Sequence, residues 1–322
     1  MHKLLIATPI SHINGLNSYL KSFTKTLLCE NADEKLIVDK IKNVDAIYIN
    51  PNKSKVYYGD KILKKAKKLK VICTASTGTN HIDMVYAKNN NINVLSLAKQ
   101  FSVIKRISST AELATTLSLM AIRNTYFAIN SVKNKNWNYE DFIGRQTSNL
   151  SVGVVGYGRL GKIYANHMLG LGSKVYVYDP YVKIEKKSKL HQLKFLKDIF
   201  IKCNIISLHV HADQKNINLI DKKVLMYAKK DCIIINTSRG EIINENHVCK
   251  FLKGNPNAKL YVDVLADEIK KKFNSPIYRF FKMKKNNQVC ITPHIGGMTK
   301  EGQLIAYFHA AKMLKKFLNK LN

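Results

Sequence analysis

The chain has 322 residues, of which 46% are hydrophobic, and a formal net charge of +31. This length suffices for two domains with buried cores, and the first apolar run is too short for a signal peptide or a membrane span. We therefore expect a cytoplasmic protein without a membrane partner. The six cysteines include no Cys-X-X-Cys pair, which argues against a disulfide framework or a zinc site. Cys73, Cys232 and Cys290 lie in strand-like runs and are expected in the core.

The positive charge suggests nucleic-acid binding as one alternative, because cationic surfaces attract phosphate backbones. Only six of the 53 basic residues are arginine, and the densest lysine run, residues 61–70, contains no aromatic residue. Stacking platforms for bases need such aromatic residues. We interpret the charge as a solvated surface and expect no nucleic-acid partner.

The first hundred residues alternate between short apolar runs and helical stretches, a pattern typical of an α/β domain. Strands are predicted at residues 3–7, 46–49, 71–74 and 92–95, and helices at residues 16–28 and 62–68. A longer apolar stretch, residues 110–126, predicts one buried helix that connects this domain to the next.

A glycine fingerprint follows the connecting helix. Strand-like residues 150–155 precede Gly156-Tyr157-Gly158-Arg159-Leu160-Gly161, and helix-like residues 162–171 come after it. In this context the first glycine permits a tight strand-to-helix turn, the second lets the backbone approach a pyrophosphate, and the third lets the helix pack on the strand. The N-terminus of the helix then faces the phosphates.

A second predicted strand, residues 174–178, ends at Asp179. At this distance from the fingerprint a carboxylate binds the adenosine ribose hydroxyls and repels the extra phosphate of NADP. The cofactor predicted from the pattern is NAD.

Four further apolar runs, at residues 205–210, 233–236, 260–264 and 289–292, bring the predicted parallel strands of this second domain to six. We expect them in the doubly wound order 3-2-1-4-5-6. An apolar helix predicted at residues 303–321 returns to the first domain. The first domain is then expected to comprise residues 1–100 plus 298–322, and the cofactor domain, residues 101–297, is an insertion within it.

Three side chains able to perform acid-base and anion chemistry follow the last three strands: Arg239, Glu268 and His294. Taken alone, each is more simply explained without catalysis: Arg239 as a solvated charge, Glu268 as a surface acid and His294 as a histidine bonded to backbone. Together they suit oxidation of an alcohol beside a carboxylate, or the reverse reduction. His294 exchanges the hydroxyl proton, Glu268 orients the imidazole, and Arg239 holds the substrate carboxylate with its planar guanidinium.

These residues closely resemble the D-isomer-specific 2-hydroxyacid dehydrogenases, the family that includes D-3-phosphoglycerate dehydrogenase. The resemblance covers most of the chain and is carried by residues 155–161, 178–181, 235–240 and 292–297, with Asp263 and Glu268. It implies that Arg239, Glu268 and His294 form the catalytic set. It also implies a flavodoxin-like substrate-binding domain made from both chain ends, and a homodimer built mainly through the cofactor domains.

The resemblance further implies a set of contacts to NAD, in which Asp263 matches an aspartate that touches the nicotinamide carboxamide. The residues concerned are Gly156, Gly158, Arg159, Leu160, Gly161, Asp179, His209, Thr237, Asp263, Gly296 and Gly297.

Two upstream segments look like substrate-binding parts of the family. The loop containing Ser76, Thr77 and Gly78 is similar to one whose backbone amides receive the substrate carboxylate, although a glycine turn after a strand also fits an ordinary connection. Lys53 and Ser54 are similar to an Arg-Ser pair that contacts a distal phosphate, with lysine here supplying a point charge only. 3-Phosphoglycerate is therefore the leading substrate candidate among small D-2-hydroxy acids.

Other features bear on rival interpretations. His209 and His211 alternate on a strand end without a third ligand in register, so we expect no metal. Trp137 lies in a connecting segment and is expected to pack, and Ile269 follows Glu268 where the family commonly has proline. Because the family also contains corepressors that respond to bound NAD, the alternative to an enzyme is an NAD(H)-sensing binding protein.

Overall fold

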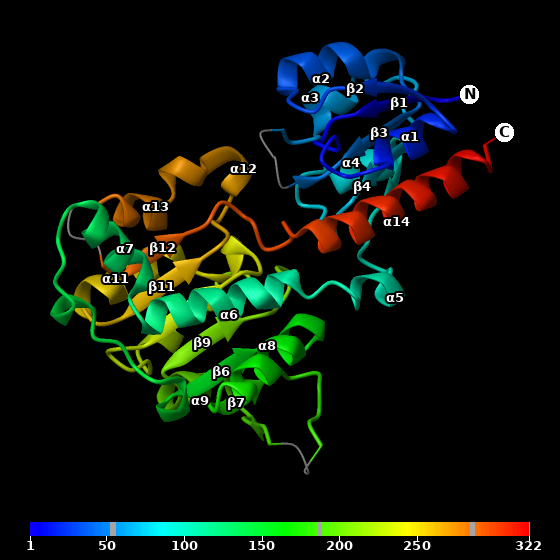
Figure 1. Cartoon of the computed structure of the whole chain (residues 1–322). Helices are drawn as coiled ribbons and strands as arrows, with labels where there is room; N and C mark the ends of the chain where they lie inside the picture. The colour runs from blue at the N-terminus through cyan, green and yellow to red at the C-terminus, as the bar shows by residue number, and fades with distance from the viewer. Residues whose placement is uncertain (52–55, 186–188, 284–286, 322) are drawn as a thin grey trace. The chain divides into compact units, whose positions relative to one another are not determined.

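The computed structural model describes residues 1–51, 56–185, 189–283 and 287–321. The chain divides into two compact units (Figure 1). The terminal unit comprises Met1–Ile107 together with Gly297–Asn322, and the central unit comprises Ser108–Gly296. The second unit is thus inserted between the two parts of the first, and both contain a parallel sheet with helices, as predicted for the fold class.

The sheet of the terminal unit is parallel throughout and has the order β2-β1-β3-β4-β5. Its strands are β1 (Lys3–Ile6), β2 (Lys25–Leu28), β3 (Ala46–Ile49), β4 (Val71–Thr74) and β5 (Asn93–Leu95). Its helices are α1 (Leu16–Lys21), α2 (Glu34–Lys40), η1 (Ile41–Asn43), α3 (Asp60–Leu63), α4 (Met84–Asn89), α5 (Phe101–Ile104) and α14 (Lys300–Leu318).

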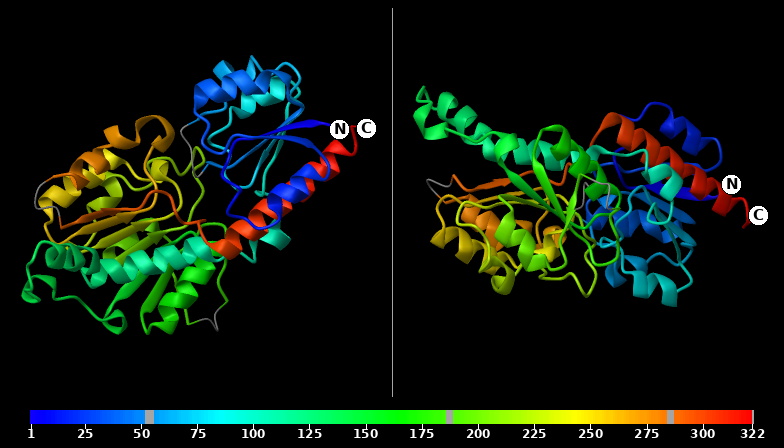
Figure 2. Two further views of the ribbon diagram at one scale, coloured as in Figure 1. Left: turned by 45° about the horizontal axis from the view of Figure 1, so that its top comes forward. Right: turned by 90° about the horizontal axis from the view of Figure 1, so that it is seen from below.

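Helices cover both faces of this sheet, which is why its inner strands are apolar without interruption. Leu4 and Ile6 of β1 pack in the core that contains α1 and α14, whereas Leu5 packs in the core that contains α2, α3 and α4. Figure 2 shows α14 running along the terminal unit next to α1.

Two helix predictions for this unit are wrong in their extent. The helix predicted at residues 16–28 ends at Lys21, and residues 25–28 form the edge strand β2. The mostly exposed Lys-Thr-Leu-Leu sequence of β2 lacks the buried apolar run that identifies a central strand. The helix predicted at residues 62–68 is the single turn Asp60–Leu63.

Within its described residues, the central unit has a sheet of seven parallel strands in the order β12-β11-β10-β9-β6-β7-β8. They are β6 (Ser151–Val155), β7 (Lys174–Tyr178), β8 (His191–Gln192), β9 (Ile205–Leu208), β10 (Ile233–Asn236), β11 (Lys259–Val262) and β12 (Val289–Ile291). Its helices are α6 (Ser109–Ile122), α7 (Thr125–Lys133), η3 (Glu140–Phe142), η4 (Thr147–Asn149), α8 (Arg159–Gly170), α9 (Leu196–Lys202), α10 (Lys222–Leu225), η5 (Gly240–Ile242), α11 (Glu245–Gly254), α12 (Glu268–Lys271), η6 (Lys272–Asn274) and α13 (Pro276–Phe281).

The strand order corrects the sequence prediction in one place. The run at residues 205–210 was expected as the third strand, beyond β7, but β9 lies between β6 and β10. The outer position beside β7 belongs to β8, which has only two residues, both exposed, and therefore leaves no hydrophobic signal. The last three strands, β10, β11 and β12, are neighbours as expected.

The connecting helix is also shorter than predicted. Helix α6 ends at Ile122, and a left-handed residue, Asn124 with φ +55°, starts the separate helix α7. The packing expected for Trp137, which follows α7, does not occur within its own chain, because 87% of its surface is exposed.

Figure 2 shows how helices enclose the central sheet, with α6 and α8 packed in one core and α9, α10, α11 and α13 in another. Cys73 in β4, Cys290 in β12 and Cys232, which directly precedes β10, are buried in the core, as predicted, and all six cysteines are free thiols. Within the described ranges, no helix combines the length and the apolar character that crossing a bilayer requires.

Candidate active site

The fingerprint forms a tight turn between β6 and α8. Gly156 has φ +93° and donates its N–H to Tyr178 O at 2.8 Å. A Cβ at Gly156 would lie 2.7 Å from His209 O, and one at Gly161 would overlap with Gly156 O. Helix α8 begins after Gly158 without a side-chain cap, and a Cβ at Gly158 would meet nothing within 4 Å. The amides of the helix N-terminus therefore border open space, as a phosphate site requires.

Asp179 fastens this turn to the end of β7. Its Oδ2 accepts a hydrogen bond from Tyr157 N at 2.7 Å, and its Oδ1 accepts one from Tyr181 N at 2.8 Å. The two bonds hold a carboxylate beside the glycine turn, where the ribose of a dinucleotide is bound in this fold.

Two further predicted cofactor residues border the turn and the neighbouring loop. Arg159 is the first residue of α8, and burial lowers the pKa of its guanidinium. Thr237 follows β10 and is 4% exposed, and its Oγ1 has no hydrogen-bond partner among the described residues. A buried hydroxyl without a partner is costly, so this atom suits a polar group of a bound ligand. The residues present fit NAD.

His209 stands at the end of β9 as a neutral imidazole. Its Nε2 lies 2.9 Å from Ser207 Oγ, and its ring centre lies 5.0 Å from that of Tyr164. Burial lowers the pKa of His209 to about 3. The side chain is therefore uncharged at neutral pH and acts through packing and hydrogen bonding.

Glu268 and His294 form a direct pair. Glu268 is the first residue of α12, and its Oε1 lies 2.5 Å from His294 Nδ1. Both side chains are partly buried, with 23% and 22% of their surface exposed. The backbone of His294 is left-handed, with φ +55°, an uncommon conformation for a residue other than glycine. The structure thus brings together two of the three predicted catalytic residues.

Asp263, at the end of β11, holds the turn that carries His294. Its Oδ1 accepts hydrogen bonds from Thr292 Oγ1 at 2.5 Å and Ile295 N at 2.8 Å, and its Oδ2 accepts one from Gly296 N at 2.7 Å. Burial raises the pKa of Asp263, and these hydrogen bonds oppose the shift. Sequence reasoning missed Thr292 as a partner, because its Thr-Pro-His context carries no signal for this bond.

The loop after β10 presents Arg239, which is partly buried. Its Nη1 donates to Ser238 O at 2.6 Å, while Asn236 Nδ2 donates to Arg239 O at 2.8 Å. Asn236 Oδ1 also accepts from Ser238 N at 3.0 Å. The side-chain amide of Asn236 thereby closes the loop at the sheet edge, a role that sequence reasoning missed.

Apart from Arg239, the predicted substrate residues belong to the terminal unit. The loop with Ser76, Thr77 and Gly78 follows β4, and Ser76 Oγ donates to Gly78 O at 2.7 Å. Lys53 and Ser54 lie outside the described residues. Gly297 is assigned to the terminal unit and Gly296 to the central unit.

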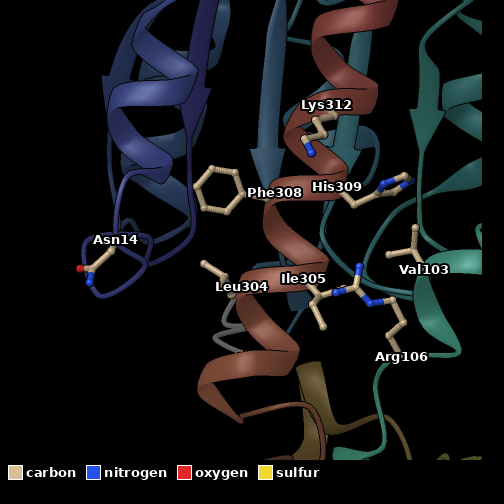
Figure 3. A pocket seen from close by; sticks show the side chains of 8 residues that line it. All are labelled: Asn14, Val103, Arg106, Leu304, Ile305, Phe308, His309 and Lys312. Atoms are coloured by element: carbon tan, nitrogen blue, oxygen red, sulfur yellow. The ribbon is translucent and has the colours of Figure 1, made fainter.

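An open pocket of about 560 Å³ lies within the terminal unit, over α14 and α5 (Figure 3). Basic side chains of Arg106, His309 and Lys312 and the apolar ring of Phe308 line it. His309 Nε2 lies 2.9 Å from Gln100 Oε1, and burial together with Lys312 lowers the pKa of His309. The pocket contains none of the predicted site residues.

Comparison with known proteins identifies the family. Residues 115–296, more than half of the chain, match the family model for the D-isomer specific 2-hydroxyacid dehydrogenase NAD binding domain. The chain belongs to this family. The match confirms the resemblance seen in the motifs and, together with the fit of the glycine turn, the prediction of NAD as cofactor.

Curated relatives agree with this family. D-3-phosphoglycerate dehydrogenase of Mycobacterium tuberculosis is 29% identical over 275 residues, which cover 85% of this chain and 49% of that protein. The enzyme of the same name from Methanocaldococcus jannaschii is 27% identical over 320 residues, covering 99% and 58%. The chain thus spans about half the length of these relatives.

Among solved structures, D-lactate dehydrogenase from Aquifex aeolicus, complexed with NAD and lactic acid, has a TM-score of 0.82 at 24% identity. The alignment covers 99% of this chain and 96% of that one. Phosphoglycerate oxidoreductase from Vibrio cholerae has a TM-score of 0.80 at 21% identity, with coverage of 99% and 100%. These likenesses confirm the fold.

Proposed function

We propose that this protein is an NAD-dependent dehydrogenase that interconverts a small D-2-hydroxy acid and its 2-keto partner. The observation that carries the proposal is the 2.5 Å contact between His294 Nδ1 and Glu268 Oε1, in the same unit as the glycine turn. Its site of action is the cytoplasm, where the six free thiols stay reduced.

The residues of the central unit divide the chemistry among them. Bound NAD supplies the hydride acceptor or donor. Because Glu268 engages Nδ1 of His294, Nε2 is the nitrogen that exchanges a proton with the substrate hydroxyl. The Glu268 carboxylate stabilises the imidazolium that results, and Arg239 binds the substrate carboxylate and polarises the C2 oxygen.

We assign cofactor binding to the predicted set in the central unit and at its boundary. The amides at the start of α8 receive the pyrophosphate, and Asp179 receives the ribose hydroxyls. His209, Thr237 and Asp263 line the nicotinamide side, with the glycines that follow His294. The unpartnered Thr237 Oγ1 supports this assignment.

We assign substrate binding to the terminal unit, Met1–Ile107 with Gly297–Asn322, which corresponds to the substrate-binding domain predicted at residues 1–100 plus 298–322. The loop of Ser76, Thr77 and Gly78 receives the carboxylate through its amides. Lys53 and Ser54 receive a distal phosphate, which makes 3-phosphoglycerate the leading substrate. The names of the curated relatives support this choice.

A substrate panel tests the proposal. Purified protein should oxidise NADH with at least one short 2-keto acid, and the panel should include phosphohydroxypyruvate beside pyruvate and longer unbranched and branched 2-keto acids. Preference for the phosphorylated compound supports 3-phosphoglycerate. Tight NADH binding without turnover of any member would contradict the enzyme and favour the NAD(H)-sensing alternative.

We also propose that the protein is a homodimer built through the central unit. Five large apolar side chains on α7 and the segment after it are at least half exposed: Ile129, Val132, Trp137, Tyr139 and Ile143. A cluster of exposed apolar residues of this size is typical of a subunit interface. This contact also explains why Trp137 lies outside the core of its own chain.

Sedimentation velocity tests this interface. We expect a dimer for the unmodified protein and a monomer for the double variant Trp137→Ser, Ile143→Ser, because both changes remove apolar area from the contact. Met226→Ser is the matched control, since Met226 is 74% exposed in the same unit but outside the cluster. A dimeric double variant, or a monomeric unmodified protein, would refute the assignment.

A further inference from the structure

The turn that precedes Glu268 is strained, and side chains from another segment of the chain form hydrogen bonds with its backbone. Asp267 has φ +49°, a left-handed conformation that costs free energy in a residue with a Cβ. Two carboxylates accept hydrogen bonds from the backbone of this turn. Glu245 Oε1 accepts from Ala266 N at 2.9 Å, and Glu241 Oε1 accepts from Asp267 N at 3.3 Å.

Glu245 is unusual for an acidic residue because it is 7% exposed. It is the first residue of α11, and Asn244 caps that helix by accepting from His247 N. A parallel bridge between Ile220 and Ile243 secures the preceding segment. The backbone that carries Glu245 is therefore held in place by these contacts. A buried carboxylate such as that of Glu245 needs a hydrogen-bond donor, and Ala266 N provides one.

The same segment begins at the loop of Arg239. A Cβ built on Gly240 would overlap with the peptide between Leu265 and Ala266, so the two backbones are in direct contact. The backbone of the loop that carries Arg239 thus contacts the backbone of the turn before Glu268. Glu241 and Glu245, which follow Arg239 in the chain, accept hydrogen bonds from that turn.

We propose that Glu245 and Glu241 are positioning residues of the reaction. Their carboxylates hold the 266–267 peptides in the left-handed turn and thereby aim Glu268 at His294 Nδ1. Asp263 likewise holds the left-handed backbone of His294, because it accepts hydrogen bonds from Ile295 N and Gly296 N. Carboxylates thus secure both members of the pair before a substrate arrives, and the contact at Gly240 couples the pair to Arg239. This inference deepens the proposed function and rests on it.

Substitution of Glu245 tests the positioning role by turnover. We expect Glu245→Ala to lower kcat by about tenfold to a hundredfold, the cost of a misplaced catalytic group, with little change in KM for NADH. Glu245→Gln should restore most of the activity, because its amide oxygen still accepts from Ala266 N. Asp221→Ala is the control: Asp221 also accepts backbone N–H groups, at the start of α10, and its loss should lower thermal stability without lowering kcat.

The Glu268→Gln background separates positioning from a general loss of structure. If Glu245 acts through Glu268, Glu245→Ala should reduce kcat much less in that background than in the unmodified protein. Equal reduction in both backgrounds, or no reduction in the unmodified protein, would overturn the proposal.

A measurement without turnover keeps the two proposals distinguishable. The His294 Nδ1–H proton bonded to Glu268 should give a downfield proton resonance in the unmodified protein and in Glu245→Gln, and Glu245→Ala should lose it while remaining folded. Persistence of the resonance in folded Glu245→Ala would overturn the positioning role. An unmodified protein that shows the resonance but no dehydrogenase activity would instead contradict the proposed function alone.

Discussion

Replacement of His294 by alanine should lower kcat for the 2-keto acid by about a thousandfold, within the range that a positioned general acid or base contributes. The variant loses the only partner that the structure shows for Glu268 Oε1 among the described residues, together with the group that exchanges the substrate proton. The dissociation constant for NADH should change little, because the glycine turn and Asp179 are formed by other elements.

Two measurements check this result: steady-state kinetics with the preferred 2-keto acid, and fluorescence titration with NADH. His211→Ala provides the matched control, because His211 is an exposed histidine in the loop after β9. Unchanged kcat in His294→Ala would remove His294 from the chemistry. A parallel loss of NADH affinity would instead indicate that the substitution damages the cofactor site.

The second large effect is expected at Gly161. The added Cβ in Gly161→Ala would overlap with the backbone oxygen of Gly156, which cannot move without opening the turn between β6 and α8. We expect a loss of about 1–3 kcal/mol in the free energy of unfolding, as for other overpacked sites. NADH affinity should fall steeply, because the same turn presents the α8 amides.

Gly170→Ala is the control for this substitution. Gly170 ends the same helix, and a Cβ there would meet nothing within 4 Å. Because alanine is a better helix former than glycine by up to about 1 kcal/mol, this variant should be as stable as the unmodified protein or more so, with normal NADH binding. Denaturant unfolding measures the stability of both variants, and titration with NADH measures their affinity for the cofactor. Equal behaviour of the two would show that the close approach at Gly161 is unimportant.

Sequence reasoning predicts the buried parallel strands well, because strands such as β4, β9 and β10 are mostly apolar and are buried along their whole length. It fails at the sheet edges. The sequence pattern predicts helix where the largely exposed β2 lies, and the two-residue β8 has no apolar pattern. The missing β8 led directly to the wrong position for β9.

The pairing of Glu268 with His294 could be predicted, because both residues follow neighbouring strands whose ends meet at one sheet edge. The backbone conformations and hydrogen bonds that hold this pair in place could not be predicted. Left-handed φ values at Asp267 and His294 depend on tertiary hydrogen bonds that backbone N–H groups of these turns donate to Glu245 and Asp263, and neither Asp267 nor His294 carries a local signal for such a turn.

The measurement that tests the proposed chemistry most directly follows the transferred hydride. The protein is given NADH that carries deuterium in the transferred position at C4, together with the 2-keto acid that it reduces best. We predict that the product carries deuterium at C2, has the D configuration, and fails to form with the His294→Ala variant. A product without deuterium at C2, a product of L configuration, or no reduction of any 2-keto acid would contradict the account.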